Sequence, residues 1–182
     1  MSAYRLTPDV AGSILMTSKL HLQGVTAMSF DKVKQYFESE GAGDKVLWLE
    51  QSSATVELAA AAIGCEPAHI AKTLSFLTDD APILIVTAGD VKVDNKKFKE
   101  LFHTKAKMIP GDQVEELIGH APGGVCPFAI KENVKVYLDE SLKRFEIVYP
   151  AAGSGNSAVR LTLPELEHFS GTSEWIDVCK ER

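Results

Sequence analysis

A lysine within an apolar strand pattern is the first residue of this chain that could do chemistry. The segment Ile70-Ala71-Lys72-Thr73-Leu74-Ser75-Phe76 has the composition of a strand. Because strand side chains alternate between two faces, Lys72 shares its face with three apolar residues, Ile70, Leu74 and Phe76. A lysine is rarely buried without a partner. Lys72 therefore either extends to solvent at the strand end or projects its ammonium group into a cavity that receives an anion.

A loop with two adjacent glycines is the second candidate. Residues 120–128, called the glycine loop below, read His-Ala-Pro-Gly-Gly-Val-Cys-Pro-Phe. Gly123 and Gly124 allow main-chain N–H groups to approach a ligand closely and to converge on one point, and the flanking prolines stiffen the loop. Such a loop could be an oxyanion hole or a phosphate cradle, and the alternative is an ordinary turn.

Cysteine and histidine residues give weaker signals. The cysteines Cys65, Cys126 and Cys179 form no CxxC pair, so neither a zinc site nor a disulfide framework is indicated. Cys126 lies in the glycine loop and could be a nucleophile if His120 reached it in space, whereas a small buried thiol is the alternative. The histidines lack the spacing of metal ligands, so we expect no metal. Free thiols are typical of a reducing cytoplasm.

A basic segment lies between residues 92 and 107. It contains six lysines and two carboxylates, a net charge of +4 in a chain whose net charge is −6. This distribution argues against a general nucleic-acid binder, but the segment could dock a short stretch of phosphate backbone. The alternative is a solvated helix face, since Lys96 and Lys99 are expected opposite Phe98 and Leu101.

The 182 residues are expected to form one domain that begins near Met28. Residues 1–27 show no regular period and no signal-peptide core, and we interpret them as an N-terminal extension, an alternative start or added residues. Residues 28–182 then form the single domain. No apolar run approaches the roughly 20 residues that a membrane helix needs.

Helices and strands alternate without a strict repeat along residues 28–182. We expect helices from Ser29 to about Gly41, over Val56–Ile63, after the cap Asp94, and over Gln113–Ile118 and Pro164–His168. We expect strands over residues 46–49, 70–76, 83–86, 106–109, 134–138, 145–149 and 158–163, and a closing segment over 175–178. Strands 70–76 and 83–86 should form a central hairpin across the turn at Asp79-Asp80. This order predicts a mixed α/β fold with a curved mixed sheet, or a barrel-like core, and helices packed outside.

Five segments, in this order and spacing, resemble the YbaK/prolyl-tRNA-synthetase-associated domain family. They are Ser53-Ala54-Thr55-Val56-Glu57, Ile70-Ala71-Lys72-Thr73-Leu74, Ala88-Gly89-Asp90, Gly123-Gly124-Val125-Cys126-Pro127-Phe128, and Ala152-Gly153 with Asn156. The resemblance covers about residues 28–180. It implies a mixed α/β domain with a curved sheet and an aminoacyl-tRNA deacylase that acts in trans or as an editing insertion of prolyl-tRNA synthetase.

The resemblance also implies roles for particular residues. The lysine of the family corresponds to Lys72 and its glycine loop to Gly123 and Gly124, which would stabilise the oxyanion. Lys72 would anchor the terminal phosphate or ribose, or act as a base if its pKa were lowered. The residues expected to bind substrate are Thr73, Cys126, Asn156 and Asp90, and those expected to contact tRNA are Lys92, Lys96 and Lys99.

Two departures from the pattern of the family keep alternatives open. Cys126 stands where relatives often carry a hydroxyl residue, which leaves a thiol hydrolase as one alternative. Ala158 stands where some relatives carry an aspartate, so that role would pass to Asn156 or Ser157. The missing aspartate leaves a non-catalytic module that binds aminoacyl-tRNA or a nucleotide as the other alternative. The expected partners are tRNA and an aminoacyl-tRNA synthetase, with no cofactor, no membrane association and a cytoplasmic location; the oligomeric state is left open.

Overall fold

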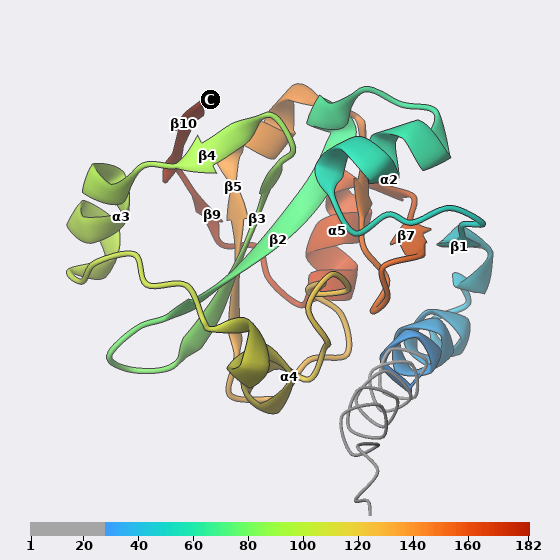
Figure 1. Ribbon diagram of the computed structural model, residues 1–182, viewed down its shortest axis with the longest axis horizontal. Helices are drawn as coiled ribbons and strands as arrows, with labels where there is room; N and C mark the ends of the chain where they lie inside the picture. The colour runs from blue at the N-terminus through green and yellow to red at the C-terminus, as the bar shows by residue number, and fades with distance from the viewer. Residues whose placement is uncertain (1–27) are drawn as a thin grey trace, which may run out of the picture.

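The structure of the protein is a computed structural model that describes residues 28–182 (Figure 1). The N-terminal extension expected over residues 1–27 lies outside the described residues. The first described helix covers residues 28–39. The helices and strands that follow are η1 (Gly43–Lys45), β1 (Val46–Trp48), α2 (Val56–Ile63), η2 (Pro67–His69), β2 (Ile70–Leu77), β3 (Pro82–Ala88), β4 (Val91–Val93), α3 (Asn95–Phe102), α4 (Gly111–Ile118), β5 (Lys135–Asp139), η3 (Glu140–Arg144), β6 (Ile147–Pro150), β7 (Ser157–Val159), β8 (Leu161–Thr162), α5 (Leu163–Ser170), β9 (Trp175–Ile176) and β10 (Cys179–Glu181).

A six-stranded mixed sheet forms the centre of the molecule. Its strand order is β8-β6-β2-β3-β5-β9, and β2 and β3 form the predicted antiparallel hairpin, in register from Ala71 opposite Ala88 to Leu77 opposite Pro82. The β2–β6, β3–β5 and β5–β9 pairs are parallel, whereas β6 and β8 are antiparallel. The curled mixed sheet with helices outside confirms the predicted fold class.

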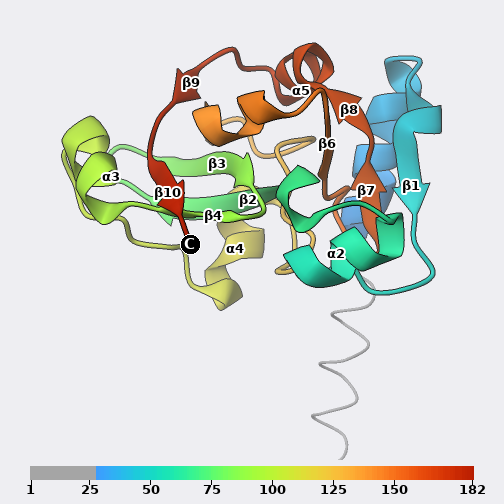
Figure 2. The same cartoon turned by 90° about the horizontal axis from the view of Figure 1, so that it is seen from above.

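Two small ribbons flank this sheet and join distant parts of the chain. β1 pairs with β7, and β4 pairs with β10, both antiparallel. Figures 1 and 2 show β10 beside β4 near the chain end, with α3 and α2 on opposite sides of the molecule. The β4–β10 ribbon places Lys92 opposite Lys180.

Local side-chain chemistry sets the helix ends. The Thr55 hydroxyl accepts a hydrogen bond from Leu58 N at the start of α2, and the carboxylate of Asp94 accepts from two N–H groups at the start of α3. A capping box of Thr162 and Glu165 begins α5. Gly64 ends α2 in the left-handed conformation, at φ 80°, which glycine adopts without strain.

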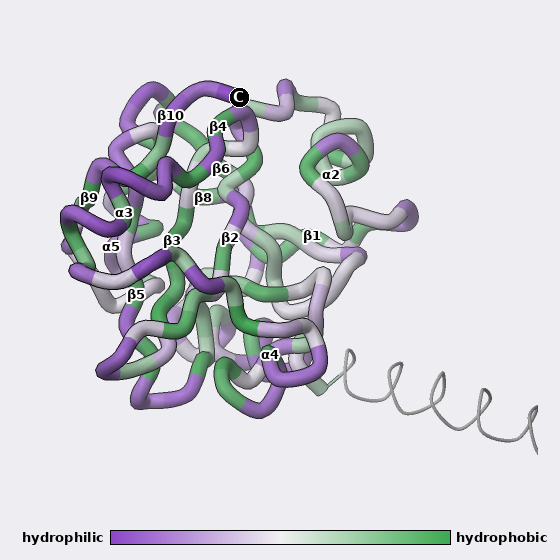
Figure 3. Tube along the Cα trace, turned by 60° about the vertical axis from the view of Figure 1, so that its left-hand side comes forward, coloured by the Kyte–Doolittle hydropathy of each residue, from purple (hydrophilic) through white to green (hydrophobic). Residues whose placement is uncertain are grey.

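The core lies between the sheet and the helices. β3 is buried along its whole length, because the sheet covers both of its edges and other elements cover both faces. Phe37 of the first described helix is fully buried and packs its ring edge-on against Phe128 at 5.0 Å between centroids. In Figure 3 the middle of the molecule is largely green, and the outer turns are largely purple.

Two sequence predictions about α3 and the segment after it are wrong. Residues 106–109 do not form a strand, since only an isolated bridge joins Met108 to Phe76. The segment cannot extend this pairing because Pro110, which has no N–H, follows at once and leads into α4. Leu101 is 45% exposed rather than inward. The inward face of α3 is formed by Phe98 and Phe102, whose rings pack together, and Leu101 lies at the side of this face.

The predicted strand over residues 158–163 is two strands. β7 pairs with β1, and β8 pairs with β6, so the chain changes partner at Arg160, whose N–H donates to the carbonyl of Lys45. Neither β4 nor β10 was predicted, because each has only three residues and depends on a partner far away in the sequence.

Candidate functional site

A cavity of about 510 Å³ lies at an open stretch of the edge of β2. On this edge β2 pairs with β6 only at residues 70–71, and with the segment 107–109 only near Phe76. Residues 72–74 lie between these two contacts, pair with β3 alone and line the cavity. An interruption in strand pairing therefore exposes both faces of β2 and its edge to one space.

Lys72 lies at this cavity and is held by main-chain carbonyls. Its ammonium group donates hydrogen bonds to the carbonyl oxygens of Val91 and, at 3.4 Å, Gly89. An ammonium group has three donors, so one is left for a ligand. Burial lowers the pKa of Lys72, and the positive charge of Arg182 lowers this pKa further, while nearby acidic groups oppose the shift.

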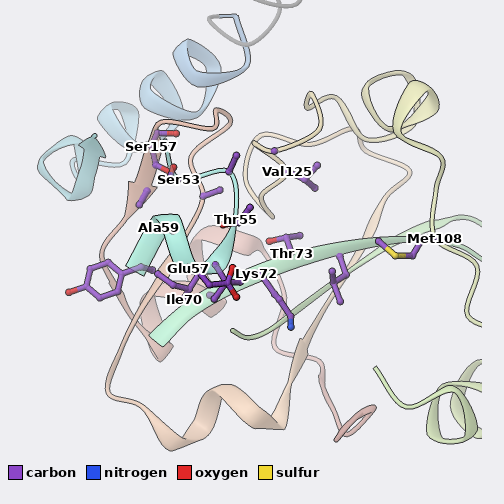
Figure 4. Close-up of a pocket in the computed structure, with 18 of the residues that line it drawn as sticks. Ser53, Thr55, Glu57, Ala59, Ile70, Lys72, Thr73, Met108, Val125 and Ser157 are labelled. Atoms are coloured by element: carbon purple, nitrogen blue, oxygen red, sulfur yellow. The ribbon is translucent and has the colours of Figure 1, made fainter. Parts of the chain in front are cut away.

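Thr73 also lines the cavity but extends to the other side of the strand. Figure 4 shows it pointing toward the side where Thr55 and Val125 lie, away from the Lys72 nitrogen. Its hydroxyl oxygen is buried and has no hydrogen-bond partner among the described residues. A buried hydroxyl without a partner is costly, so this oxygen is a natural contact for a polar ligand atom.

The two glycines of the glycine loop have different positions. Gly123, at φ 87°, lines the cavity together with Val125. Gly124 is buried behind it, and its N–H donates to the carbonyl of Ala121 at 3.1 Å. In this structure a turn already uses the N–H of Gly124, so the predicted stabilisation of an oxyanion by the glycine loop falls to its neighbours. The N–H groups of Gly123 and Val125 have no hydrogen-bond partner within residues 28–182, and both residues line the cavity, so these groups are the better candidates for contact with an oxyanion.

Close packing explains why Gly124 must lack a side chain. A Cβ atom there would lie 2.5 Å from the carbonyl carbon of Gly153, in the second polar loop. Gly153 in turn approaches the main chain of Ser29, 2.6 Å from the position of its own Cβ. The N–H of Ser53 donates to the carbonyl of Gly155 at 2.6 Å. Three loops thus pack main chain against main chain to form one wall of the cavity.

Neither Cys126 nor Asn156, both predicted to bind substrate, lines the cavity. Cys126 is fully buried, and its sulfur lies 3.5 Å from His120 Nε2, but it does not line the cavity. Asn156 does not line it either: its main chain donates to Ser154 Oγ and accepts from Leu49 N, so it shapes the loop. Their predicted contact with substrate is not supported by these positions.

Asp90 is occupied by an arginine. Arg144 donates two hydrogen bonds to the Asp90 carboxylate, at 2.6 and 2.9 Å. This pairing lowers the pKa of Asp90 and raises that of Arg144. Asp90 does not line the cavity; the ion pair instead braces the turn whose Gly89 and Val91 carbonyls hold Lys72.

The predicted basic residues lie on the surface of the protein and do not line the cavity. Lys92 on β4 and Lys96 and Lys99 on α3 are all exposed. Lys96 lies 4.0 Å from Glu100, a distance at which an exposed pair contributes little stability. These lysines therefore remain candidates for contact with a phosphate backbone beyond the cavity.

Sequence reasoning missed several residues that line the cavity. Glu57 on α2 and Arg182 after β10 form an ion pair at 3.7 Å, and both line the cavity. Tyr149 of β6 and Met108, which is 57% exposed, also line it. Glu57 belongs to a segment that carries the family resemblance, but no local pattern marks Arg182 or Met108.

Among the described residues, no group of three or more histidine, cysteine, aspartate or glutamate side chains is placed to hold a metal ion. In the same part of the chain no helix combines the length and the apolar composition needed to cross a membrane.

A family model described as "Aminoacyl-tRNA editing domain" matches residues 50–169. The chain is 50% identical over 155 residues to the uncharacterized protein YwhH of Bacillus subtilis, an alignment that covers 85% of this chain and 99% of YwhH. It is 32% identical over 90 residues to the proline–tRNA ligase of Bacillus pumilus; this alignment covers 49% of this chain but only 16% of the ligase.

The fold is also found among solved structures. A crystal structure described as that of a candidate trans-editing enzyme for prolyl tRNA synthetase superposes with a TM-score of 0.76 at 31% sequence identity. The superposition covers 84% of this chain and 97% of the other.

Proposed function

The chain belongs to the aminoacyl-tRNA editing domain family, and on this premise we propose that it is a trans-acting deacylase that hydrolyses the ester of tRNA mischarged with a small amino acid. The observation that carries the proposal is that Lys72 lines one cavity together with Gly123 and Val125, whose N–H groups have no hydrogen-bond partner among the described residues. The similarity to a structure described as a candidate trans-editing enzyme supports action in trans.

The proposed reaction is ester hydrolysis at the tRNA 3′ end. The oxygen of a water molecule adds to the ester carbonyl carbon, and negative charge develops on the carbonyl oxygen. The N–H groups of Gly123 and Val125 stabilise that charge, an effect that can be worth about 3 kcal/mol for one well-placed donor. The C–O bond to the ribose then breaks, the ribose oxygen takes up a proton, and a free amino acid leaves.

Lys72 anchors the substrate in this proposal. The carbonyls of Gly89 and Val91 fix the ammonium group, so its remaining donor can contact the terminal ribose or phosphate. Because burial lowers the pKa of Lys72, a neutral amine that accepts a proton is the competing role. We favour anchoring, because the tRNA end is anionic and the two carbonyl acceptors favour the charged form.

The hydroxyl of Thr73 contributes a polar contact inside the cavity. Outside it, Lys92, Lys96 and Lys99 contact the tRNA backbone, and their effect should weaken as salt concentration rises. The partners in this proposal are an aminoacylated tRNA and, through it, an aminoacyl-tRNA synthetase, in the cytoplasm.

A second candidate function rests on how few carboxylates line the cavity among the described residues. Ala158, where some relatives carry an aspartate, lines the cavity, and the carboxylate of Glu57 is paired with Arg182. No unpaired carboxylate therefore lines the cavity among the described residues. This observation favours a module of the same fold that binds aminoacyl-tRNA or a nucleotide without hydrolysing it.

A deacylation panel tests the proposal. The purified full chain is mixed with tRNA carrying radiolabelled alanine, cysteine, serine or threonine, and loss of the label from tRNA is followed over time. Lys72→Met, which keeps the apolar stem without the charge, is compared with wild type. Lys135→Met, at an exposed position on β5, is the matched control.

We expect wild type and the control to hydrolyse one or two of these substrates, and Lys72→Met to be at least tenfold slower. An unchanged rate in Lys72→Met would refute the role of Lys72. No hydrolysis of any substrate, together with salt-sensitive binding of the same tRNA, would favour the binding module.

A further inference from the structure

Three buried polar side chains meet behind the glycine loop. Ser29 is 3% exposed, and His120 and Cys126 are fully buried. Ser29 Oγ lies 3.0 Å from His120 Nδ1, His120 Nε2 lies 2.7 Å from the carbonyl oxygen of Phe128, and Cys126 Sγ lies 3.5 Å from Nε2. The hydroxyl of Ser29, the thiol of Cys126 and the main-chain carbonyl of Phe128 thus converge on the imidazole ring of His120.

The ring of His120 joins the two ends of the glycine loop by a hydrogen bond. His120 begins the loop and Phe128 ends it, and a carbonyl oxygen only accepts, so Nε2 carries the proton that bonds the two ends. On the other side of the ring, the Ser29 hydroxyl, which has a single proton, lies within hydrogen-bond distance of both Nδ1 and the carbonyl of Gly119, the residue that ends α4, at 3.0 and 3.1 Å. Gly123 and Val125 lie within the segment that this contact closes.

The cluster is not a catalytic triad, although its residue types resemble one. Neither His120 nor Cys126 lines the cavity, and both are fully buried. A nucleophilic thiol must reach the carbonyl carbon of its substrate. The main chain of Gly124, packed against Gly153, belongs to the wall between this cluster and the cavity.

We propose that His120 is a positioning residue, whose ring, held by Ser29 and Phe128, keeps the glycine loop in the conformation that presents the N–H groups of Gly123 and Val125 to the cavity. This inference rests on the proposed function for its catalytic consequence, though not for its structural one. The loop has one internal main-chain hydrogen bond among the described residues, from Gly124 N to Ala121 O, so its shape depends on support from behind.

The proposal predicts different effects for two substitutions of His120, glutamine and leucine. A glutamine side chain places its terminal nitrogen near the position of Nε2 and can restore the bond to Phe128, whereas leucine fills similar space without any donor. Leucine would also leave the carbonyl of Phe128 and the hydroxyl of Ser29 without the ring as partner. His168→Gln, at an exposed position on α5, is the matched control.

The first measurement is independent of any catalytic activity. Wild type, His120→Leu, His120→Gln and the control are treated with iodoacetamide under native conditions, and alkylation of Cys126 is quantified by peptide mass spectrometry. We expect Cys126 to be protected in wild type, in the control and in His120→Gln. In His120→Leu we expect labelling at least tenfold faster, because the loop opens while circular dichroism remains that of a folded protein.

The second measurement is steady-state deacylation with a substrate that wild type accepts. We expect His120→Leu to lower kcat at least tenfold with KM changed less than threefold, because Lys72 is untouched, and His120→Gln to recover most of kcat. If His120→Leu does not fold, Ser29→Ala, which removes one support of the ring, replaces it in both measurements, with a smaller loss of kcat expected.

The outcomes separate this inference from the proposed function. Protected Cys126 and unchanged kcat in folded His120→Leu would overturn the inference, as would faster labelling without any change in kcat. Rapid alkylation of Cys126 in wild type with loss of activity would overturn it in favour of a thiol nucleophile. If wild type hydrolyses nothing, the proposed function fails, and the labelling result alone then decides whether His120 holds the loop.

Discussion

The substitution Gly124→Ala tests whether the wall of the cavity depends on contact between two loops. The added Cβ atom would lie 2.5 Å from the carbonyl carbon of Gly153 and 2.6 Å from the main-chain nitrogen of Ser154. No rotamer change can relieve overlap with main-chain atoms, and favourable contacts between carbon atoms begin at about 3.5 Å. The two loops must therefore separate by about 1 Å.

Two consequences of Gly124→Ala follow from this separation. Overpacking of this kind costs roughly 1–3 kcal/mol of the free energy of unfolding. Taking about 2 kcal/mol, we expect Tm to fall by about 4–8 °C for a protein of this size. A displacement of about 1 Å also moves Gly123 and Val125 relative to Lys72, and misplacement on this scale can reduce the hydrolysis rate about 100-fold.

Thermal unfolding followed by circular dichroism and the deacylation assay measure these two effects. Gly155→Ala is the control within the same pair of loops, because its Cβ atom would lie 3.4 Å from Ala54 Cβ, an ordinary contact. We expect the control to keep the Tm and the rate of wild type. Equal behaviour of Gly124→Ala and Gly155→Ala in both assays would refute the reasoning that close main-chain packing sets the shape of the cavity.

Three further predictions concern the hydroxyl in the cavity, one charged helix cap and the core. Thr73→Val removes a buried hydroxyl without a described partner, so we expect Tm to rise, by an amount corresponding to about 1 kcal/mol, while deacylation slows; a lower Tm would contradict this. The bond from Lys180, with help from the N–H groups of α3, lowers the pKa of Asp94 to about 2, so ionised Asp94 stabilises the folded state above about pH 4, and this contribution disappears as pH falls through about 2. Asp94→Asn keeps the helix cap, and urea unfolding should show a stability deficit that is constant between about pH 5 and 7 and closes toward pH 2; a deficit that grew on acidification would argue against the ion pair. Phe37→Ala removes a fully buried ring packed on Phe128, so we expect urea unfolding to report a loss of about 3–5 kcal/mol, and a loss below 1 kcal/mol would show that the helix over residues 28–39 is not part of the core.

Elements that depend on neighbouring residues could be predicted from the sequence. The bounds of α2 and the cap Asp94 of α3 depend on residues within one helical turn, so local composition was sufficient. The hairpin of β2 and β3 needed only two apolar runs and a short polar turn. The same local pattern placed Lys72 on a strand and identified the glycine loop.

Pairings between distant segments could not be predicted in this way. β10 needs β4, and β1 needs β7, yet each of these strands has only three residues and no distinctive period of its own. Their stability comes from hydrogen bonds and packing that exist only after the chain has folded. For the same reason the segment 106–109 resembled a strand in composition but found only one bridge.

The candidate site also has a part that local sequence could identify and a part that depends on contacts between distant residues. The sequence by itself identified Lys72 and two glycines as candidates for chemistry, because a lysine in an apolar strand pattern and a Gly-Gly loop between prolines can both be read from neighbouring residues. Only the tertiary structure decided which of their groups are free: Gly124 N–H is used by a turn and Asp90 is held by Arg144. A hydrogen bond or an ion pair depends on distances of a few ångströms between residues far apart in the chain, and sequence spacing does not contain those distances.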